Sequence, residues 1–278
     1  DGVEVTAIDH ARHTVTTSDG DQHSARILIG ADGINSRVRR SLPSIYDRER
    51  WQKNLGWALE LVIPRDELQA PGDRGGPIRL DDGILIPHLV FGACRWGYGW
   101  VFPNKNAVIV GIGGLLQKNG KDLPNRFKEF LDAIGLSAFA DRRPIGSHLA
   151  FGNYIPAPIH GEALLVGDAG GFASPILGEG IFYAHRTAEL AAHAINRHLT
   201  AWTSLAETYT ALLQRRLIPE LQAEMALRDF LYHYLDAQVR IPLEAFIKTA
   251  STRVIDAVQG SRSFRGFRRD DDLHSAVW

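Results

Sequence analysis

The stretch Leu-Leu-Val-Gly-Asp-Ala-Gly-Gly-Phe-Ala-Ser-Pro-Ile-Leu-Gly-Glu-Gly-Ile-Phe spans Leu164–Phe182 and decides how the rest of the chain is interpreted. A short apolar strand, Ala163–Val166, runs directly into an acid, Asp168. Small residues and Pro175 follow, and Gly178-Glu179-Gly180 then opens a long helix. Glycines of this kind let another molecule come close to the backbone.

Two interpretations of this loop fit the residues alone. A carboxylate after a parallel-type strand can accept a hydrogen bond from a ligand hydroxyl, as Asp168 would, while the small residues admit a sugar or phosphate. The amides of Gly178, Gly180 and Ile181 at a helix N-terminus favour an electron-rich group. The alternative is an ordinary strand-to-helix loop, in which Asp168 caps a helix and the glycines only make turns.

Composition narrows the classes of protein. The 278 residues are 45% hydrophobic and 23% charged, and 31 Lys and Arg nearly balance 32 Asp and Glu, which argues against a nucleic acid partner. The single cysteine, Cys94, cannot form an internal disulfide, so we expect a reducing compartment. No apolar run reaches the length of a membrane span. We therefore expect a globular, cytoplasmic protein.

The pattern of the chain predicts a mixed α+β and α/β fold. Alternation at Val3–Ile8 and His13–Thr17 predicts paired strands, Ala25–Ile29 a third strand, and Asn35 or Ser36 the cap of a helix. An antiparallel sheet is expected from five strand-like runs: Leu55–Ile63, Pro77–Leu80, Ile84–Val90, Gly97–Phe102 and Ala107–Gly113. Helical spacing occurs in four segments: Leu123–Ile134, Gly178–Leu199, Leu205–Arg216 and Ile218–Leu235.

Two motifs resemble a flavoprotein group that includes para-hydroxybenzoate hydroxylase. Gly167-Asp168-Ala169-Gly170, with Pro175 and Gly178-Glu179-Gly180-Ile181, is similar to its second FAD-binding fingerprint. Gly30-Ala31-Asp32-Gly33-Ile34-Asn35-Ser36-Arg37-Val38-Arg39 resembles its Asp-Gly motif. The resemblance implies FAD as cofactor, with NAD(P)H or another reductant as electron donor. The implied cofactor-binding residues are Ala31, Asp32, Gly33, Gly167, Asp168, Pro175, Gly178, Glu179, Gly180 and Ile181.

A third motif resembles the geranylgeranyl reductase family. Tyr98-Gly99-Trp100-Val101-Phe102-Pro103, followed by Gly111-Ile112-Gly113, is similar to the family's Tyr-x-Trp-x-Phe-Pro and Gly-x-Gly pattern. Alternate residues of a strand share a face, so Tyr98, Trp100 and Phe102 lie together, either as the wall of a substrate pocket or as core. With the resemblance we favour the pocket wall. Cys94 matches no motif position and receives no role.

The resemblance also implies an organisation of the chain. We expect part of an FAD-binding domain at 1–45, a β-rich substrate domain at 46–150, a return to the FAD-binding domain at 151–200 and a helical C-terminal region at 201–278. The family's opening Gly-x-Gly-x-x-Gly strand and helix have no counterpart here, so we expect the dinucleotide-binding element to be missing and FAD to be held weakly by this chain alone.

Three functions follow as hypotheses. The first is a flavin-dependent reductase of carbon-carbon double bonds in a prenyl chain, which implies an apolar, prenyl lipid-like substrate and peripheral membrane contact. The second is a flavin-dependent aromatic hydroxylase, and the third a noncatalytic fragment that acts as a binding module. No nucleophile triad or metal-ligand spacing is visible, so we assign no catalytic residue and no metal. Arg37, Arg39 and Arg40 could meet a nicotinamide phosphate, but we favour a solvated helix face for them.

Overall fold

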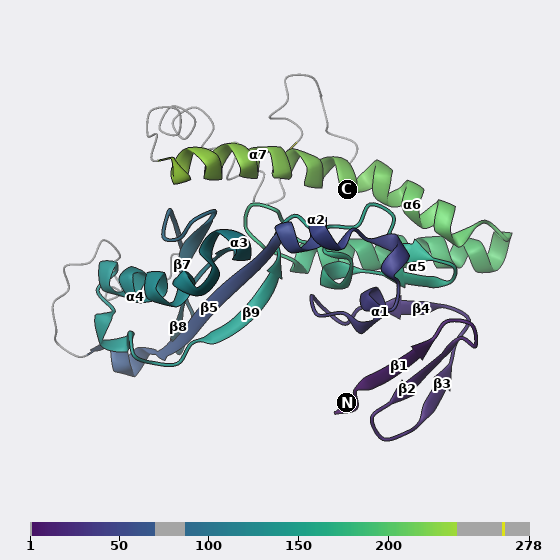
Figure 1. Ribbon diagram of the computed structural model, residues 1–278, viewed down its shortest axis with the longest axis horizontal. Coiled ribbons are helices and arrows are strands. Elements are labelled where there is room, and N and C mark those ends of the chain that lie inside the picture. Colours follow the sequence, from purple (N-terminus) through teal and green to yellow (C-terminus); the bar gives the residue numbers. More distant parts are fainter. Residues whose placement is uncertain (1, 70–86, 238–262, 265–278) are drawn as a thin grey trace. The chain divides into compact units, whose positions relative to one another are not determined.

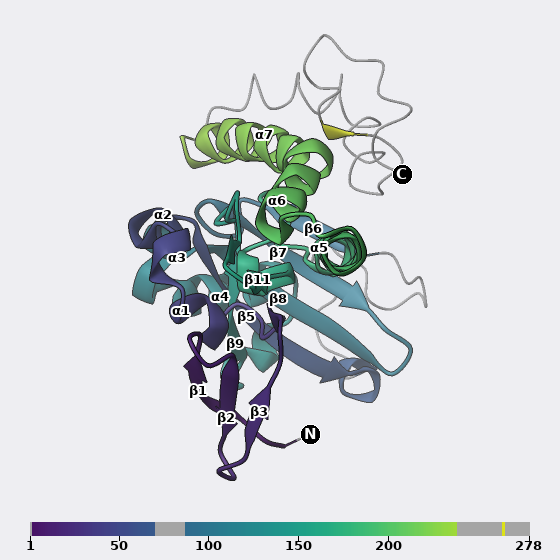
Figure 2. The same ribbon diagram turned by 90° about the vertical axis from the view of Figure 1, so that its right-hand side faces the viewer.

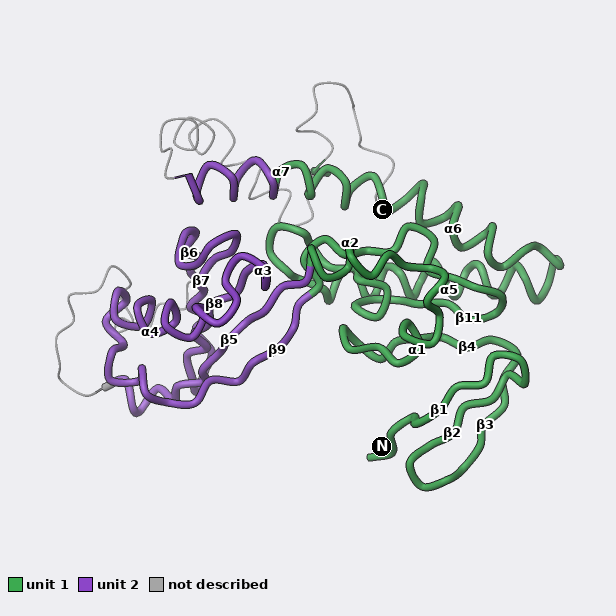
Figure 3. Tube along the Cα trace, viewed as in Figure 1, with its two compact units in different colours: residues 1–54, 150–227, 251–278 green, residues 55–149, 228–250 purple. Residues whose placement is uncertain are grey.

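The computed structural model describes residues 2–69, 87–237 and 263–264. The predicted strand Pro77–Leu80 and the first part of Ile84–Val90 lie outside these residues. The chain divides into two compact units (Figure 3). Unit 1 comprises residues 1–54, 150–227 and 251–278, and unit 2 comprises 55–149 and 228–250. Each unit is described by itself.

Unit 1 begins with a small antiparallel sheet of three strands in the order β1-β2-β3 (Figures 1 and 2). The predicted pairing of the first two runs is confirmed, since Ile8 lies opposite Val15. The predicted third strand, Ala25–Ile29, is wrong in its bounds, because the chain forms two short strands there that belong to different sheets. The strands are β1 (Val5–Asp9), β2 (Thr14–Thr17), β3 (Gln22–Ser24) and β4 (Leu28–Gly30).

A second sheet of unit 1 has the order β10-β11-β4. Its strand β11 pairs antiparallel with β10 and parallel with β4. Buried aliphatic and aromatic side chains from β11 and three helices form its core, among them Leu164, Leu190, Tyr209 and Leu221. The elements are α1 (Arg37–Arg40), α2 (Arg48–Lys53), β10 (Ile159–His160), β11 (Ala163–Leu165), α5 (Ile181–Ala201), α6 (Leu205–Arg216) and α7 (Ile218–Asp236).

Unit 2 is built on a five-stranded sheet in the order β6-β7-β8-β5-β9. The expected antiparallel sheet is confirmed, because β5, β6, β7 and β8 pair antiparallel. The hydrophobic core contains residues of β5, β7 and β8 together with Phe127, Phe130 and Leu131 of α4. The elements are β5 (Leu55–Pro64), β6 (His88–Phe91), β7 (Gly97–Pro103), β8 (Ala107–Leu115), α3 (Leu116–Asn119), α4 (Leu123–Ala133) and β9 (Ile145–Ala150).

The fold class predicted from the sequence is confirmed: strands and helices are mixed, a parallel strand pair lies in one unit, an antiparallel sheet in the other, and α5, α6 and α7 follow toward the C-terminus. Helix α7 continues from unit 1 into unit 2 at residue 228. Among the described residues, no helix is both long enough and apolar enough to cross a membrane.

Candidate functional site

Two neighbouring parallel strands of unit 1 end side by side and carry the two flavoprotein-like motifs. Strand β4 pairs with β11 so that Gly30 lies opposite Leu165, and the amide of Val166 donates to the Gly30 carbonyl at 3.0 Å. Ligands of open α/β sheets bind outside the carboxyl ends of parallel strands. A Cβ on Gly30 would lie 2.6 Å from Leu165 Cδ2, so only glycine fits this close pair. The two loops that leave these strands form the candidate site.

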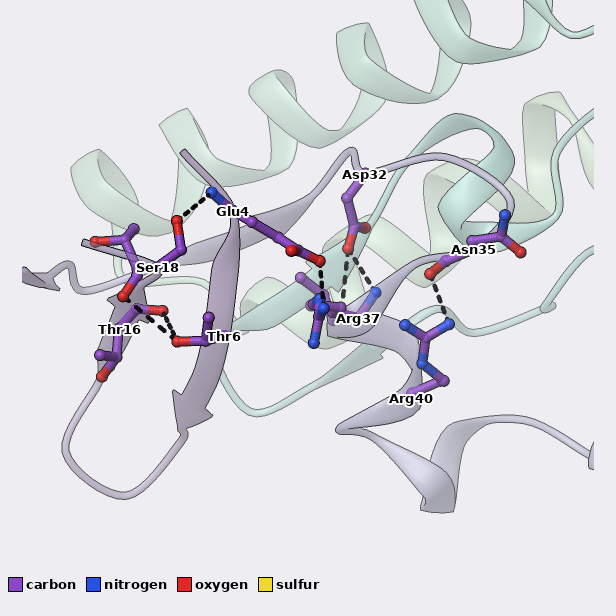
Figure 4. A network of polar contacts seen from close by, with 10 residues as sticks. Glu4, Thr6, Thr16, Ser18, Asp32, Asn35, Arg37 and Arg40 are labelled. Atoms are coloured by element: carbon purple, nitrogen blue, oxygen red, sulfur yellow. Dashed lines mark hydrogen bonds and ion pairs between the residues drawn. The ribbon is translucent and has the colours of Figure 1, made fainter. Parts of the chain in front are cut away.

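The first loop, Ala31–Asn35, is held by the acid of its motif. Asp32 Oδ2 accepts hydrogen bonds from the amides of Arg37 at 2.6 Å and Val38 at 3.3 Å (Figure 4). Ser36 Oγ accepts from the amide of Arg39 at 2.8 Å, so of the two predicted caps Ser36 is the one that the structure uses. Asp32 therefore stabilises the start of α1 with one carboxylate oxygen.

Two of the three arginines of α1 are exposed, as expected. The Arg37 guanidinium pairs with Glu4 of the first sheet, and Arg40 Nη1 donates to the Asn35 carbonyl at 2.7 Å. Figure 4 shows both contacts, and it also shows that Glu4 accepts from Arg37 while its amide donates to Ser18, which directly follows β2.

Arg39 contradicts the prediction of a solvated face, because only 4% of it is exposed. Its Nη1 donates to the Ala169 carbonyl at 3.0 Å and its Nη2 to the Ile34 carbonyl at 2.7 Å. The guanidinium lies 3.6 Å from the ring centroid of Trp51, and burial lowers its pKa to about 10. Arg39 therefore connects the first loop to the second. Its partner Ala169 lies 130 residues further along the chain, so the sequence pattern does not reveal the contact.

The second loop starts at the 3₁₀ turn Gly167–Gly170, which packs against α5. The amide of Gly167 donates to Thr187 Oγ1 at 2.8 Å, and Gly167 has a φ of 52°. A Cβ at Gly167 would lie 3.0 Å from Ala184 Cβ, so both the backbone angle and the close helix favour glycine. Tyr209 of α6 donates its hydroxyl to the Leu165 carbonyl at 2.9 Å, which fixes the end of the strand.

Asp168 has the properties of a ligand-binding acid. It is half-buried, and burial, followed by the charge of Glu179, raises the pKa of its carboxyl group. Within the described part of the chain, no group donates a hydrogen bond to it, so the alternative in which it caps a helix finds no support. A Cβ on Gly180 would lie 2.8 Å from Asp168 Oδ1, so glycine at this position allows the backbone before α5 to approach the carboxylate closely.

The helix after this loop begins later than predicted. It starts at Ile181 rather than Gly178, because Gly178 has a φ of 67° and its amide donates to the Ser174 carbonyl at 2.8 Å. The Gly178 amide is therefore used inside the loop and does not face a ligand. Ile181 opens α5 with 84% of its surface exposed, and its amide has no acceptor within the helix. Glu179 Oε1 accepts from the Phe182 amide at 3.0 Å.

The third motif lies in unit 2, and the structure places its three aromatic rings on one face of β7. Trp100 lies 5.7 Å from Tyr98 and 6.3 Å from Phe102 between ring centroids. On the other face of the strand, a Cβ on Gly99 would meet Phe130 of α4 at 2.6 Å. The three aromatic residues therefore face away from the core between the sheet and α4.

This aromatic face is partly open. Tyr98 and Trp100 are each 8% exposed and Phe102 is 37% exposed. The indole of Trp100 lies on the backbone of β8, since a Cβ on Gly111 would approach its Cζ2 to 2.2 Å, and its Nε1 donates to Glu60 Oε2 at 3.2 Å. The glycines of the Gly-x-Gly pattern thus make room for Trp100 itself, where the sequence suggested close approach of a ligand.

The described residues also include a thiol and side chains of the types that bind metals. Cys94 is buried, its Sγ lies 3.2 Å from the Gly113 carbonyl, and burial raises the pKa of its thiol to about 12. In the described ranges, no group of three or more His, Cys, Asp or Glu side chains is arranged to hold a metal ion.

Comparison with solved structures defines the class of fold. The structure is similar to a geranylgeranyl bacteriochlorophyll reductase-like protein of Thermoplasma acidophilum, with a TM-score of 0.67 and 18% identity over 86% of this chain and 61% of that chain. It is also similar to PqsL of Pseudomonas aeruginosa, described as a probable FAD-dependent monooxygenase, with a TM-score of 0.52 and 20% identity over 84% of this chain and 63% of that chain. The chain therefore has the fold that this reductase-like protein and this probable FAD-dependent monooxygenase share.

Comparison with curated sequences supports the narrower resemblance, since the chain is similar to geranylgeranyl reductases. It is 31% identical over 173 residues to the geranylgeranyl diphosphate reductase of Rhodobacter capsulatus, covering 61% of this chain and 39% of the relative. It is 29% identical over 221 residues to the menaquinone reductase of Mycobacterium tuberculosis, covering 73% of this chain and 50% of the relative. The chain spans half or less of the length of both. No protein-family model matches it.

Proposed function

We propose that this chain is part of an FAD-dependent oxidoreductase that reduces carbon-carbon double bonds of a prenyl chain. The observation that carries the proposal is Asp168, a half-buried carboxylate with no hydrogen-bond donor among the described residues, placed over Gly180 at the end of a parallel strand. A cofactor hydroxyl fits this acceptor. When bound, reduced FAD would supply a hydride, replenished by NAD(P)H or another reductant, and a proton from solvent or substrate would complete the addition to the double bond.

Each loop has its own part in holding the cofactor. Asp168 accepts a hydrogen bond from a ribityl or ribose hydroxyl, while Gly180 and Ile181 present the N-terminal end of α5 to the pyrimidine edge. The second oxygen of Asp32 and the backbone of Ala31 and Gly33 contact the cofactor from the first loop. Gly167, Pro175, Gly178 and Glu179 shape the second loop rather than donate to the ligand. In this proposal residues 1–45 and 151–200 form the cofactor part.

The substrate part is proposed to be residues 46–150, with residues 201–278 as a helical C-terminal region. Tyr98, Trp100 and Phe102 offer aromatic area outside the α4 core, which suits an apolar, elongated prenyl chain. For such a substrate we propose a cytoplasmic protein that contacts the membrane surface peripherally. The relatives named for geranylgeranyl diphosphate and menaquinone reduction support this choice of chemistry.

A second candidate, hydroxylation of an aromatic ring, is favoured by the similarity to PqsL. One experiment separates the two candidates from a binding module. In one arm the chain is incubated anaerobically with FAD, dithionite and geranylgeranyl diphosphate. In a second arm it is incubated in air with FAD, NADPH and the aromatic compound 2-aminobenzoylacetate, which is bound in a PqsL structure, and the products of both arms are analysed by mass spectrometry. We expect products that gain pairs of hydrogen atoms, and Asp168→Ala as the control without turnover. Gain of an oxygen atom would support the hydroxylase, and unchanged substrate beside bound FAD would support the binding module.

A further inference from the structure

Glu224 of unit 1 contacts the second loop through its buried carboxylate, although it is not among the residues proposed to bind the cofactor. Glu224 of α7 has 0% of its surface exposed. Its Oε2 accepts a hydrogen bond from Ser174 Oγ at 2.5 Å, and its Oε1 accepts one from the Tyr183 hydroxyl. Ser174 lies inside the loop and Tyr183 in the first turn of α5. Glu224 therefore joins the helix α7 to both ends of the segment that leads into α5.

Ser174 is the residue that closes this loop. Its amide donates to the Glu179 carbonyl at 2.7 Å, and its carbonyl accepts from the Gly178 amide at 2.8 Å. Its Oγ also accepts from the Leu177 amide at 3.2 Å. Because the hydroxyl donates its one proton to Glu224, its lone pairs are oriented toward that amide. Without the Glu224 carboxyl group, the Ser174 hydroxyl would no longer be oriented to accept from the Leu177 amide.

Among the described residues, the charged groups that act on Glu224 are acidic. Glu220, one turn earlier on α7, and Glu179 of the loop both act on it, and within the described ranges no arginine or lysine pairs with it. Burial raises the pKa of Glu224 to about 7, against the opposing effect of the bonds from Ser174 and Tyr183. The pKa of Tyr183 is raised well above its ordinary value, first by burial and then by Glu224, so its hydroxyl stays a donor.

We propose that Glu224 is a positioning residue: through Ser174 and Tyr183 it fixes the loop from Gly171 to Gly180, and thereby the backbone beside Asp168. The positioning role itself needs only the contacts above, while its meaning for catalysis rests on the proposed function, in which this loop holds FAD. No substrate or cofactor contact is assigned to Glu224 itself.

The dependence of this hold on pH follows from linkage. The pKa of Glu224 in the closed loop lies above its ordinary value of 4.5, so its favourable contribution is complete below pH 4.5 and is lost as the pH rises through 7. Any opening that exposes Glu224 to water is therefore favoured at higher pH. The opening constant should rise by about a hundredfold between pH 4.5 and 8, since each unit of pKa difference allows about a tenfold change.

Hydrogen exchange at the loop amides tests the proposal on this chain without any flavin. The protection of Ser174 and Gly178 is measured from pH 5 to 8, corrected for intrinsic exchange, in the wild type and in Glu224→Gln, Glu224→Ala and Ser174→Ala. We expect wild-type protection to fall steeply across this range. Glu224→Gln keeps a side chain that bonds both hydroxyls but cannot ionise, so its protection should stay high and flat. Ser174→Ala should lose protection at every pH.

Glu220→Gln is the matched control, the same substitution one turn away on the same helix, and it should retain the pH dependence. The proposal is overturned if wild type and Glu224→Gln show the same profile, or if Ser174→Ala leaves the loop protected. Should Glu224→Ala fail to fold, the other two variants still decide. An FAD titration of the same variants distinguishes the positioning role of Glu224 from the proposed FAD-dependent function. The expected exchange pattern without any FAD binding would support the positioning role and contradict the proposed function.

Discussion

The two loops of the candidate site leave neighbouring parallel strands and carry the same type of acid near the strand end, yet the acids are used differently. Asp32 is exposed, and one of its oxygens accepts from two amides of α1. Asp168 is half-buried, and its carboxylate accepts no hydrogen bond from the described residues. The difference teaches that an acid after a strand is not by itself a ligand site. What separates them is whether the chain supplies its own donors.

Substitution of Arg39 should have the largest effect on stability, because Arg39 joins the two loops. Arg39→Ala removes two hydrogen bonds to carbonyls and the contact with Trp51, and leaves the Ile34 and Ala169 carbonyls without that donor. We expect a loss of about 3 kcal/mol in unfolding free energy, measured by urea denaturation, since an unsatisfied buried polar group costs about 1–3 kcal/mol. Arg37→Ala on the same helix is the control and should cost much less. Equal losses would show that Arg39 does not join the loops.

The substitution Asp32→Ala should lower the unfolding free energy moderately. Asp32→Ala removes the carboxylate that accepts from the amides of Arg37 and Val38, and loss of such a cap costs about 1 kcal/mol. Asp168→Ala removes no hydrogen bond within the described residues and should leave the unfolding free energy almost unchanged. A larger loss for Asp168→Ala than for Asp32→Ala would reverse the comparison.

The smallest expected effect is a pH dependence at Asp168. Because burial and Glu179 raise the pKa of this carboxyl group, its favourable contribution to stability is complete below its ordinary pKa of 3.8 and is lost as the pH rises. Asp168→Asn should therefore gain melting temperature relative to the wild type at pH 7 and show no gain near pH 3. A gain at pH 3 that disappears at pH 7 would mean that the charged form is the stabilised one.

The parts of the fold that depend on local pattern were predictable. Helix α6 has the predicted bounds, and β5, β7 and β8 match their alternating or apolar runs to within two residues. The start of α5 was not predictable in the same way, because the hydrogen bond from Gly178 to Ser174 closes the loop before the helix begins. The sequence could predict that both motifs follow strands. It could not predict that the Asp32 carboxylate accepts from its own helix while the Asp168 carboxylate does not.

The residues that sequence reasoning missed all act over long separations. Arg39 looked like a surface residue among other arginines, and only its contact with a carbonyl 130 residues away explains its burial. Glu224 contacts Ser174 across 50 residues. A weak signal for Glu224 exists, since Glu220 and Glu224 are spaced by one helical turn on a side of α7 that also holds the buried Leu221. The pattern alone could not show that this side is enclosed.

The central claim is that Asp168 binds the cofactor while Asp32 mainly holds its own helix. It is tested most directly by titrating FAD into this chain and into Asp168→Ala and Asp32→Ala, with flavin fluorescence as the readout. We expect wild-type binding weaker than micromolar, and for Asp168→Ala a further loss of about 10-fold or more, because a hydrogen bond to a charged group contributes about 1.5–3 kcal/mol. Asp32→Ala should bind FAD within a few-fold of the wild type. Unchanged FAD affinity in Asp168→Ala, with a large loss in Asp32→Ala, would contradict the account.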